Sequence, residues 1–323
     1  STAGPAPAPL PARRALLMAA RPRTAEDDEF DEADRILSDL RKKGATGESD
    51  IPWGVCIGRA WSDDGQLCVT REYVAAAGAP PLLLRELPYS AHPDRDVGVN
   101  GTGGVVWAGA VGLAELLRER APEVLRPPDR ADDAHRGLAI LELGAGCGLA
   151  GLCAAALLSS TELDVPPGAP AHVVLTDESE AVLDNLRRNV ELNRGAVASR
   201  CRLEVARLEW EELLDGETSG PVEAQSVDIL LGSDVIWGHR GVLVGRVARR
   251  LVSPGGLLVI TAQEGREGLP EFEAELRRPP EPAAAGPPHA AGEGPVFDVQ
   301  TLHTTCAGES LVHYICRRAA GGG

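Results

Sequence analysis

The chain has 323 residues, of which 43% are hydrophobic, enough for one large α/β domain or two smaller ones. Its formal net charge of −16 argues against nucleic acid as a partner, because binding to phosphates relies on clusters of Lys and Arg. No apolar run approaches the roughly 20 residues of a membrane-spanning helix, which argues against a membrane protein. Seven cysteines without metal-ligand spacing predict no metal site and a reducing compartment, for which we expect the cytoplasm.

The first 50 residues have the composition of a segment without a core. Residues 1–25 are rich in Ala and Pro and contain four arginines but no acidic residue. Part of an organelle transit peptide would share some of these features, but abundant Pro and scarce Ser favour a low-complexity tail. By the same reasoning we expect a disordered insertion at residues 279–295 and a short tail at 319–323.

Residues 51–97 change to short apolar runs separated by turn signals. GVCIGRAW and QLCVTREYV flank an Asp-Asp-Gly turn and predict a β-hairpin, and LLLRELPY predicts a further extended segment. Because these strands precede a nucleotide-binding type of fold, we interpret them as an added cap or substrate-side element.

Strands and helices alternate from residue 98 to residue 278. The loop GVNGTGG precedes a helix that is predicted to begin near Val105 and to carry Trp107 in its first turn. The segment LAILELGAGCGLAG then predicts a strand, a glycine turn and a helix. Further strands are expected to end at Asp177, near Trp210, after Ser233 and at LLVIT, each connected by a helix. The helix after Asp177 is expected to bury an apolar stripe of Val182, Leu183, Leu186, Val190 and Leu192.

This alternation predicts an α/β fold with a doubly wound, mostly parallel sheet. The final segments VFDVQTLHTTC and SLVHYICRR predict a hairpin, so the Rossmann-like sheet is expected to have seven strands and to end antiparallel. Ligands of such sheets bind at the carboxyl ends of the strands.

The ligand of the glycine turn is ambiguous because two patterns overlap there. Gly146, Gly148 and Gly151 satisfy the G-x-G-x-x-G of a dinucleotide fold. Glu142 with Gly144, Gly146 and Gly148 satisfies the E-x-G-x-G-x-G of enzymes that use S-adenosylmethionine (SAM). A purely structural reading, in which the glycines allow close packing of strand and helix, requires no ligand.

Six sequence pieces, including the glycine turn, occur in the same order as in one known family. They are GGVVWAGAVGLAELL, ILELGAGCGLAGL, VVLTDESEAVLDNLRRNVELN, LEW, VDILLGSDVIW and SPGGLLVIT. Over residues 104–318 the chain resembles class I, seven-β-strand SAM-dependent methyltransferases, and family 16 in particular, which includes many protein-lysine methyltransferases. The resemblance implies a methyltransferase domain at 98–318, SAM as cofactor and transfer of a methyl group to a lysine of a protein substrate. We expect the chain to act as a monomer.

The resemblance also assigns residues to the cofactor. The glycine turn would lie against the methionyl and ribose portions, and the carboxylate of Asp177 would accept the ribose hydroxyls. Asp177 could instead cap the helix that follows, and Trp107 could simply belong to the core. The complete set of cofactor-binding candidates is Trp107, Glu142, Gly144, Gly146, Gly148, Asp177, Trp210 and Ser233.

Asp234 and Trp237 are the catalytic candidates. Lysine-methylating relatives commonly have Asp-x-x-Tyr at this position, whereas this chain has Asp-Val-Ile-Trp. Asp234 would orient the amine, and Trp237 keeps an aromatic face for a cation but lacks the hydroxyl of Tyr. Methylation of a small molecule, Arg or His therefore stays an alternative, as do an NAD-dependent oxidoreductase and a non-catalytic interaction module.

Overall fold

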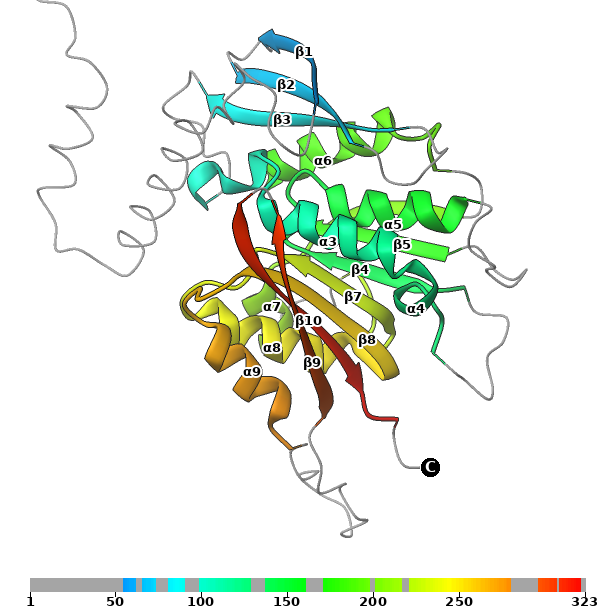
Figure 1. The fold of residues 1–323 in the computed structure, drawn as a ribbon, viewed down its shortest axis with the longest axis vertical. Helices are drawn as coiled ribbons and strands as arrows, with labels where there is room; N and C mark the ends of the chain where they lie inside the picture. The colour runs from blue at the N-terminus through cyan, green and yellow to red at the C-terminus, as the bar shows by residue number, and fades with distance from the viewer. Residues whose placement is uncertain are drawn as a thin grey trace, which may run out of the picture.

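The computed structural model describes residues 55–61, 66–73, 81–90, 99–128, 137–160, 171–197, 201–216, 221–279, 296–306 and 308–320. These residues form a seven-stranded sheet with helices on both faces and a separate three-stranded sheet (Figure 1). The segment expected to lack a core at residues 1–50 lies outside the described residues, as do the expected insertion at 279–295 except residue 279 and the expected tail at 319–323 except residues 319 and 320.

The large sheet has the predicted mixed topology, with strand order β6-β5-β4-β7-β8-β10-β9. The parallel strands are β4 (Ala139–Leu143), β5 (Ala171–Asp177), β6 (Cys201–Arg207), β7 (Val227–Ser233) and β8 (Val252–Gln263). β10 (Glu309–Arg318) pairs antiparallel with both β8 and β9 (Phe297–Cys306). The closing hairpin is therefore confirmed.

Two helical layers cover this sheet, because alternate residues of its strands point to opposite faces. One layer contains α3 (Ala108–Glu119), the short α4 (Ala121–Val124), α5 (Leu149–Ser159) and α6 (Glu180–Leu192). The other contains α7 (Trp210–Asp215), α8 (Arg240–Leu251) and α9 (Leu269–Arg277). No helix in the described part of the chain is long and apolar enough to cross a bilayer.

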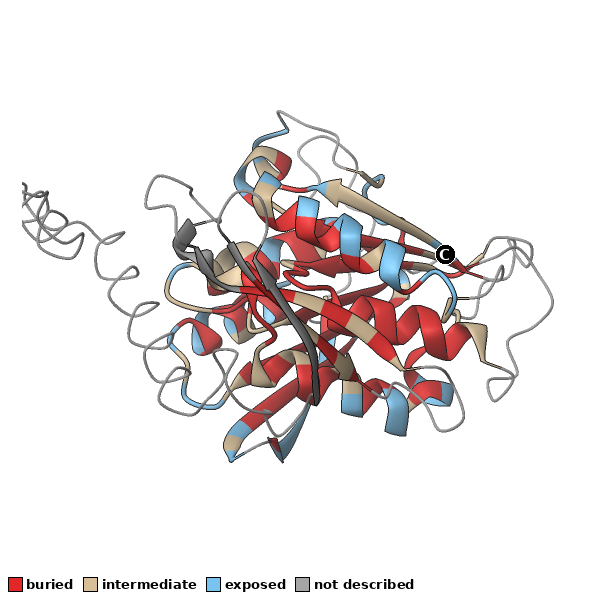
Figure 2. Cartoon of the chain, turned by 90° about the horizontal axis from the view of Figure 1, so that it is seen from above, coloured by how far each residue is buried: buried red, intermediate tan, exposed pale blue. Residues whose placement is uncertain are grey.

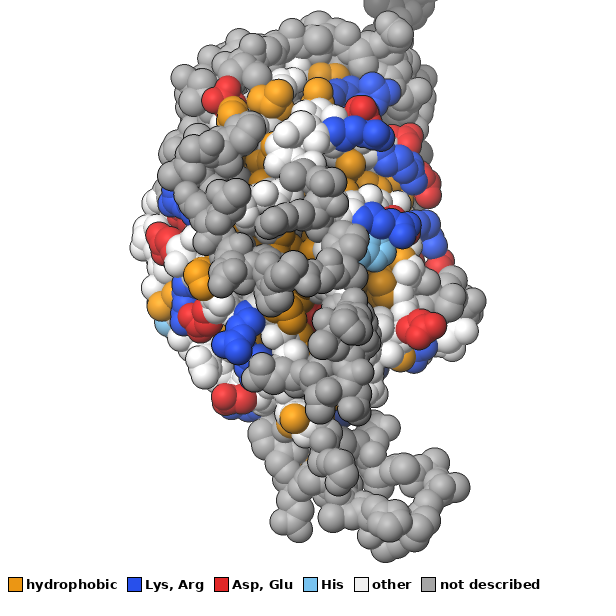
Figure 3. Space-filling view, turned by 90° about the vertical axis from the view of Figure 1, so that its right-hand side faces the viewer, with side chains coloured by type: hydrophobic (Ala, Val, Ile, Leu, Met, Phe, Trp, Pro, Cys, Tyr) orange, Lys and Arg blue, Asp and Glu red, His pale blue; other side chains and the backbone are white. Residues whose placement is uncertain are grey.

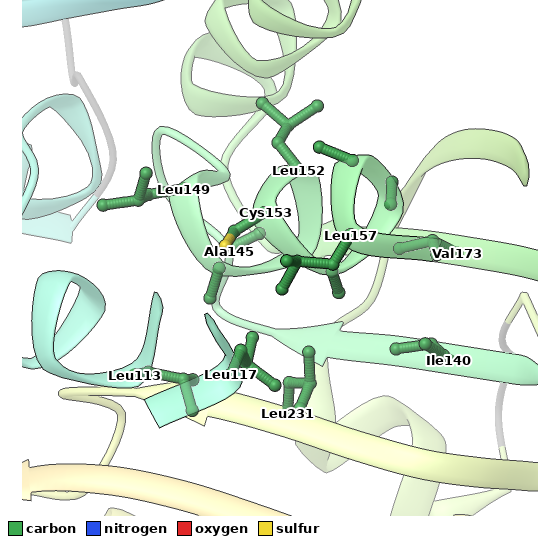
Figure 4. Packing of buried hydrophobic residues seen from close by; sticks show 14 of the residues in the cluster. Leu113, Leu117, Ile140, Ala145, Leu149, Leu152, Cys153, Leu157, Val173 and Leu231 are labelled. Atoms are coloured by element: carbon green, nitrogen blue, oxygen red, sulfur yellow. The ribbon is translucent and has the colours of Figure 1, made fainter. Parts of the chain in front are cut away.

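Helix α5 is the most deeply buried helix of the first layer (Figure 2). Its sequence, LAGLCAAALLS, is apolar on every side, and every residue from Leu149 to Leu158 is buried. Cys153 and Leu157 lie on the side of α5 that packs against α3 and the sheet, and Leu152 lies on the opposite side of the helix (Figure 4). An all-apolar helix is stable here because it has neighbours on each side.

The N-terminal sheet consists of β1 (Val55–Trp61), β2 (Gln66–Tyr73) and β3 (Leu82–Ser90), all antiparallel. The expected hairpin is thus present, and β3 extends it. In Figure 1 this sheet lies beside α6, and β3 contacts both α6 and α5.

Several local predictions were wrong. Residues 99–104 form a 3-10 helix, η1 (Val99–Gly104), instead of an open loop, and α3 begins at Ala108 with Trp107 as its N-cap residue. Trp210 begins α7 and does not end a strand. Leu192, expected on the apolar stripe of α6, is 46% exposed, because asparagines occupy the buried positions of that turn.

Charged side chains of both signs are mixed on the described part of the face shown in Figure 3. The described residues also form exposed ion pairs, among them Arg207 with Glu212 and Arg187 with Asp184. Such pairs contribute about 0–1 kcal/mol each, so the two helical layers rather than surface charges hold the fold together.

Candidate functional site

An open cleft of about 1180 Å³, including the solvent at its mouth, lies at the carboxyl ends of β4, β5 and β7. Its walls come from the segment before α3, from the glycine turn and from the loops that follow β5, β6 and β7. Nine of the predicted site residues line it: Trp107, Gly144, Gly146, Gly148, Asp177, Trp210, Ser233, Asp234 and Trp237.

The glycine turn connects β4 to α5 in conformations that favour glycine. Gly144, Gly146 and Gly148 have φ angles of 53°, 53° and 82°. A Cβ on Gly146 would lie 3.2 Å from the carbonyl oxygen of Gly103, so the turn is also packed against the segment before α3. Gly151 serves packing instead, since a Cβ there would lie 2.1 Å from a methyl carbon of Leu175. The packing reading therefore holds for Gly151, whereas Gly144, Gly146 and Gly148 line the cleft in conformations that favour glycine.

Glu142 is the one predicted site residue that does not line the cleft. It is buried beneath the turn, and its Oε2 accepts the backbone N–H of Gly151 at 2.9 Å. Burial raises the pKa of this carboxyl from 4.5 to about 8, and the nearby Asp177 raises it further, against the hydrogen bond from Gly151. We correct its assignment as a cofactor ligand: Glu142 fixes the N-terminal turn of α5, where its acceptor oxygen replaces a missing helical partner.

Asp177 lies at the end of β5 and faces the cleft, as predicted. Its Oδ2 accepts the N–H of Gly146 and its Oδ1 the N–H of Ser179, both at 3.2 Å. Burial raises the pKa of this carboxyl, and the two backbone N–H groups oppose that change. Asp177 thus holds the glycine turn and the chain just before α6 in place, and its side chain lines the cleft.

The segment before α3 closes one side of the cleft. The indole N–H of Trp107 donates to the carbonyl of Thr102 at 2.8 Å, which folds the segment onto itself. The amide of Val106, in the same segment, donates to Oε1 of Glu86 at 3.0 Å. Trp107 is half-buried and lines the cleft, so it does not belong wholly to the core.

Asp234 follows β7 in a conformation that is uncommon for a side chain other than glycine, with a φ of 52°. Its Oδ2 accepts the N–H of Gly109 at 2.8 Å, at the N-terminus of α3. Its Oδ1 is buried without a hydrogen-bond partner among the described residues. Burial raises the pKa of Asp234, an effect that Arg266 opposes. One carboxylate oxygen thus holds α3, while the other is buried without a partner among the described residues, in a side chain that lines the cleft.

Arg240, which sequence reasoning missed, joins the two tryptophans of the cleft. The carbon of its guanidinium lies 5.3 Å from the ring centroid of Trp210 and 5.5 Å from that of Trp237. Its Nη2 is 3.4 Å from Oε1 of Glu178. The guanidinium therefore covers part of the Trp237 ring that we had assigned to a substrate amine. Nothing in the sequence marked Arg240, because it reaches the cleft only through the packing of α8 beside α7.

A family model described as lysine methyltransferase matches residues 94–272, which is more than half of the chain. The protein-lysine N-methyltransferase EFM6 of Saccharomyces cerevisiae is 30% identical over 145 residues, covering 44% of this chain and 54% of that protein. The protein N-lysine methyltransferase METTL21A of Mus musculus is 33% identical over 137 residues, covering 42% and 49%.

Among solved structures, an O-methyltransferase from Bacillus cereus in complex with SAH is 17% identical and covers 64% of this chain and 90% of that chain. Its TM-score is 0.39. This chain spans about half the length of the curated relatives it matches. Because the family model matches more than half of the chain, the chain belongs to the lysine methyltransferase family.

Proposed function

We propose that the protein transfers a methyl group from SAM to the side-chain amine of a lysine in a protein substrate. The observation that carries the proposal is the convergence of the glycine turn, Asp177 and Asp234 on one cleft in a chain of the lysine methyltransferase family. An NAD-dependent oxidoreductase is disfavoured by the family match. The cytoplasm stays the proposed location.

The residues of the cleft fit SAM. The glycine turn presents backbone without side chains, and Asp177 keeps free lone pairs for ribose hydroxyls beside its two backbone bonds. Trp210 and Leu208 offer apolar surface for an adenine. When bound, SAM supplies the activated methyl group.

On the substrate side, Asp234 is proposed to orient the attacking amine. Its side chain lines the cleft, and its buried Oδ1 has no hydrogen-bond partner among the described residues while its Oδ2 stays on Gly109. The nearby cations Arg240 and Arg266 disfavour a charged ammonium and thereby favour the neutral amine that can attack. Because Arg240 covers part of Trp237, an amine can contact this ring only on its remaining surface.

Methyl-labelled SAM, incubated with the pure protein and a lysate, tests the proposal. We expect label on a protein, and mass spectrometry of the labelled peptide should place it on lysine. Asp234→Asn is the matched control, since its amide oxygen can still hold Gly109 while the charge is lost, and it should give little label. Label on Arg, His or only on small molecules would contradict the lysine assignment. Calorimetric binding of NADH instead of SAM would contradict the proposal as a whole.

A further inference from the structure

Three asparagines on one face of α6 join the N-terminal sheet to the rest of the fold. Asn185, Asn189 and Asn193 are spaced by four residues, so they lie one turn apart, and all are buried. Asn189 accepts the N–H of Arg85 and donates to its carbonyl, and Asn193 does the same with Leu83, at 2.8 to 3.1 Å. These side chains bond to the edge of β3 much as a neighbouring strand would.

Asn189 continues this connection to the glycine turn. Its Nδ2 also donates to the carbonyl of Cys147 at 3.0 Å. The corresponding extra bond of Asn193 goes to the carbonyl of Asn189, within α6 itself. Asn189 therefore links β3 directly to a wall of the cleft, and Asn193 does not.

A buried ion pair makes a second connection from the N-terminal sheet to the cleft. The Nε of Arg71, on β2, lies 2.7 Å from Oε2 of Glu86, on β3, and the two side chains are 0% and 2% exposed. The other oxygen of Glu86 accepts the amide of Val106, which is itself buried. The guanidinium of Arg71 balances the charge of the Glu86 carboxylate. Glu86 in turn gives a hydrogen-bond acceptor to the amide N–H of Val106, which is buried away from water.

The segment held by Glu86 is pressed against the glycine turn. The carbonyl of Gly103 is 3.7 Å from the sulfur of Cys147, and there is no room for a Cβ on Gly104 beside the carbonyl of Leu87, at 2.8 Å. Residues Thr102, Gly103, Val105 and Val106 all line the cleft. Strand β3 thus touches both the segment before α3 and, through Asn189, the glycine turn.

We propose that Glu86 and Asn189 are positioning residues of the cofactor site, and that the N-terminal sheet is an integral part of that site rather than a substrate-side cap. The inference rests on the proposed function, because it takes SAM as the occupant of the cleft. Glu86 fixes the segment before α3 and Asn189 fixes the glycine turn, so the two walls keep their separation through β3.

Two double variants isolate the bond to Val106. Arg71→Met with Glu86→Gln removes the ion pair but keeps a neutral acceptor, whereas Arg71→Met with Glu86→Leu removes both. Replacing a buried ion pair by uncharged side chains of similar volume commonly preserves folding. Loss of this bond should make SAM binding about tenfold weaker in the Leu variant than in the Gln variant. The unpaired N–H also lowers the melting temperature of the Leu variant, whereas the kcat at saturating SAM should differ little between the two.

A second pair of variants keeps the ion pair intact. Asn189→Ala and Asn193→Ala each remove two bonds to β3, but only Asn189→Ala also frees the carbonyl of Cys147. We expect Asn189→Ala to raise the KM for SAM several-fold more than Asn193→Ala does, with similar kcat. If either double variant fails to unfold cooperatively, the comparison of Asn189→Ala with Asn193→Ala tests the positioning role by itself.

The outcomes separate this inference from the proposed function. If the unmodified protein does not bind SAM in calorimetry, the proposed function fails and the inference fails with it. If it binds SAM, and the members of each pair share the same SAM affinity, the proposed function stands and the positioning roles are refuted. A difference between members in melting temperature alone would also refute them.

Discussion

The glycine turn should make the stability of the protein depend on pH through Glu142. This carboxyl is 1% exposed, and burial raises its pKa to about 8. The folded protein therefore keeps a proton that the unfolded chain releases above its ordinary pKa near 4.5. The stabilising contribution is complete below that ordinary value and is lost as the pH rises through about 8.

The size of this effect follows from proton linkage. While the folded form is protonated and the unfolded form ionised, the free energy of unfolding falls by about 1.4 kcal/mol per pH unit. The folded form begins to titrate near the upper end of the range, so Glu142 lowers the free energy of unfolding by about 2 kcal/mol between about pH 6 and about pH 8.

Glu142→Gln removes the titration but keeps an oxygen that can accept the N–H of Gly151. Urea unfolding of both proteins at several pH values measures the difference, and other titrating groups cancel in it. We expect the wild type to lose about 2 kcal/mol more than the variant over this range. Parallel pH profiles would refute a buried, protonated Glu142.

Four further predictions concern single side chains. Asp177→Ala should weaken SAM binding by about 1.5–3 kcal/mol in calorimetry, since charged acceptor bonds to the ribose are lost; an unchanged affinity would remove Asp177 from the site. Asp234→Asn should lower kcat by about 100-fold or more while SAM affinity changes much less, and an active variant would exclude the proposed role in orienting the amine. Trp237→Phe should keep part of the methyltransferase activity, and Trp237→Ala should lose most of it. Trp237→Tyr should be at least as active as wild type. Equal rates in all three variants would make Trp237 a packing residue. Burial lowers the pKa of His313 to about 4. Its stabilising contribution is therefore present above its ordinary pKa near 6.5 and lost as the pH falls toward 4. In urea unfolding, the free energy of unfolding of His313→Gln should fall less in acid than that of the wild type.

Much of the fold could be predicted because it depends on local patterns. Alternating apolar strands and amphipathic helices require a parallel sheet with crossovers, and the final hairpin signals placed two antiparallel strands at its edge. The cleft was predictable for a related reason, since ligands bind where the carboxyl ends of parallel strands meet. Asp177 and Asp234 could be located because each directly ends a strand.

Which atoms of these residues face the cleft was decided only by tertiary packing. Glu142 belongs to the E-x-G-x-G-x-G pattern, yet the close contact of α5 with β4 directs its carboxyl to Gly151. The carboxylate of Asp234 accepts the N–H of Gly109 in α3, which lies 125 residues earlier in the chain. Arg240 lies between two tryptophans from different loops, a contact with no local signal.

The asparagines of α6 show the same limit most clearly. Sequence periodicity identified the helix, but it assigned Leu192 to the buried face and gave no reason to expect Asn189 and Asn193 there, because polar side chains are normally exposed. Their burial becomes favourable only when the edge of β3 supplies partners for both the amide oxygen and the amide nitrogen. Local patterns thus determined the order of strands and helices, whereas long-range hydrogen bonding decided which polar residues build the interior around the cleft.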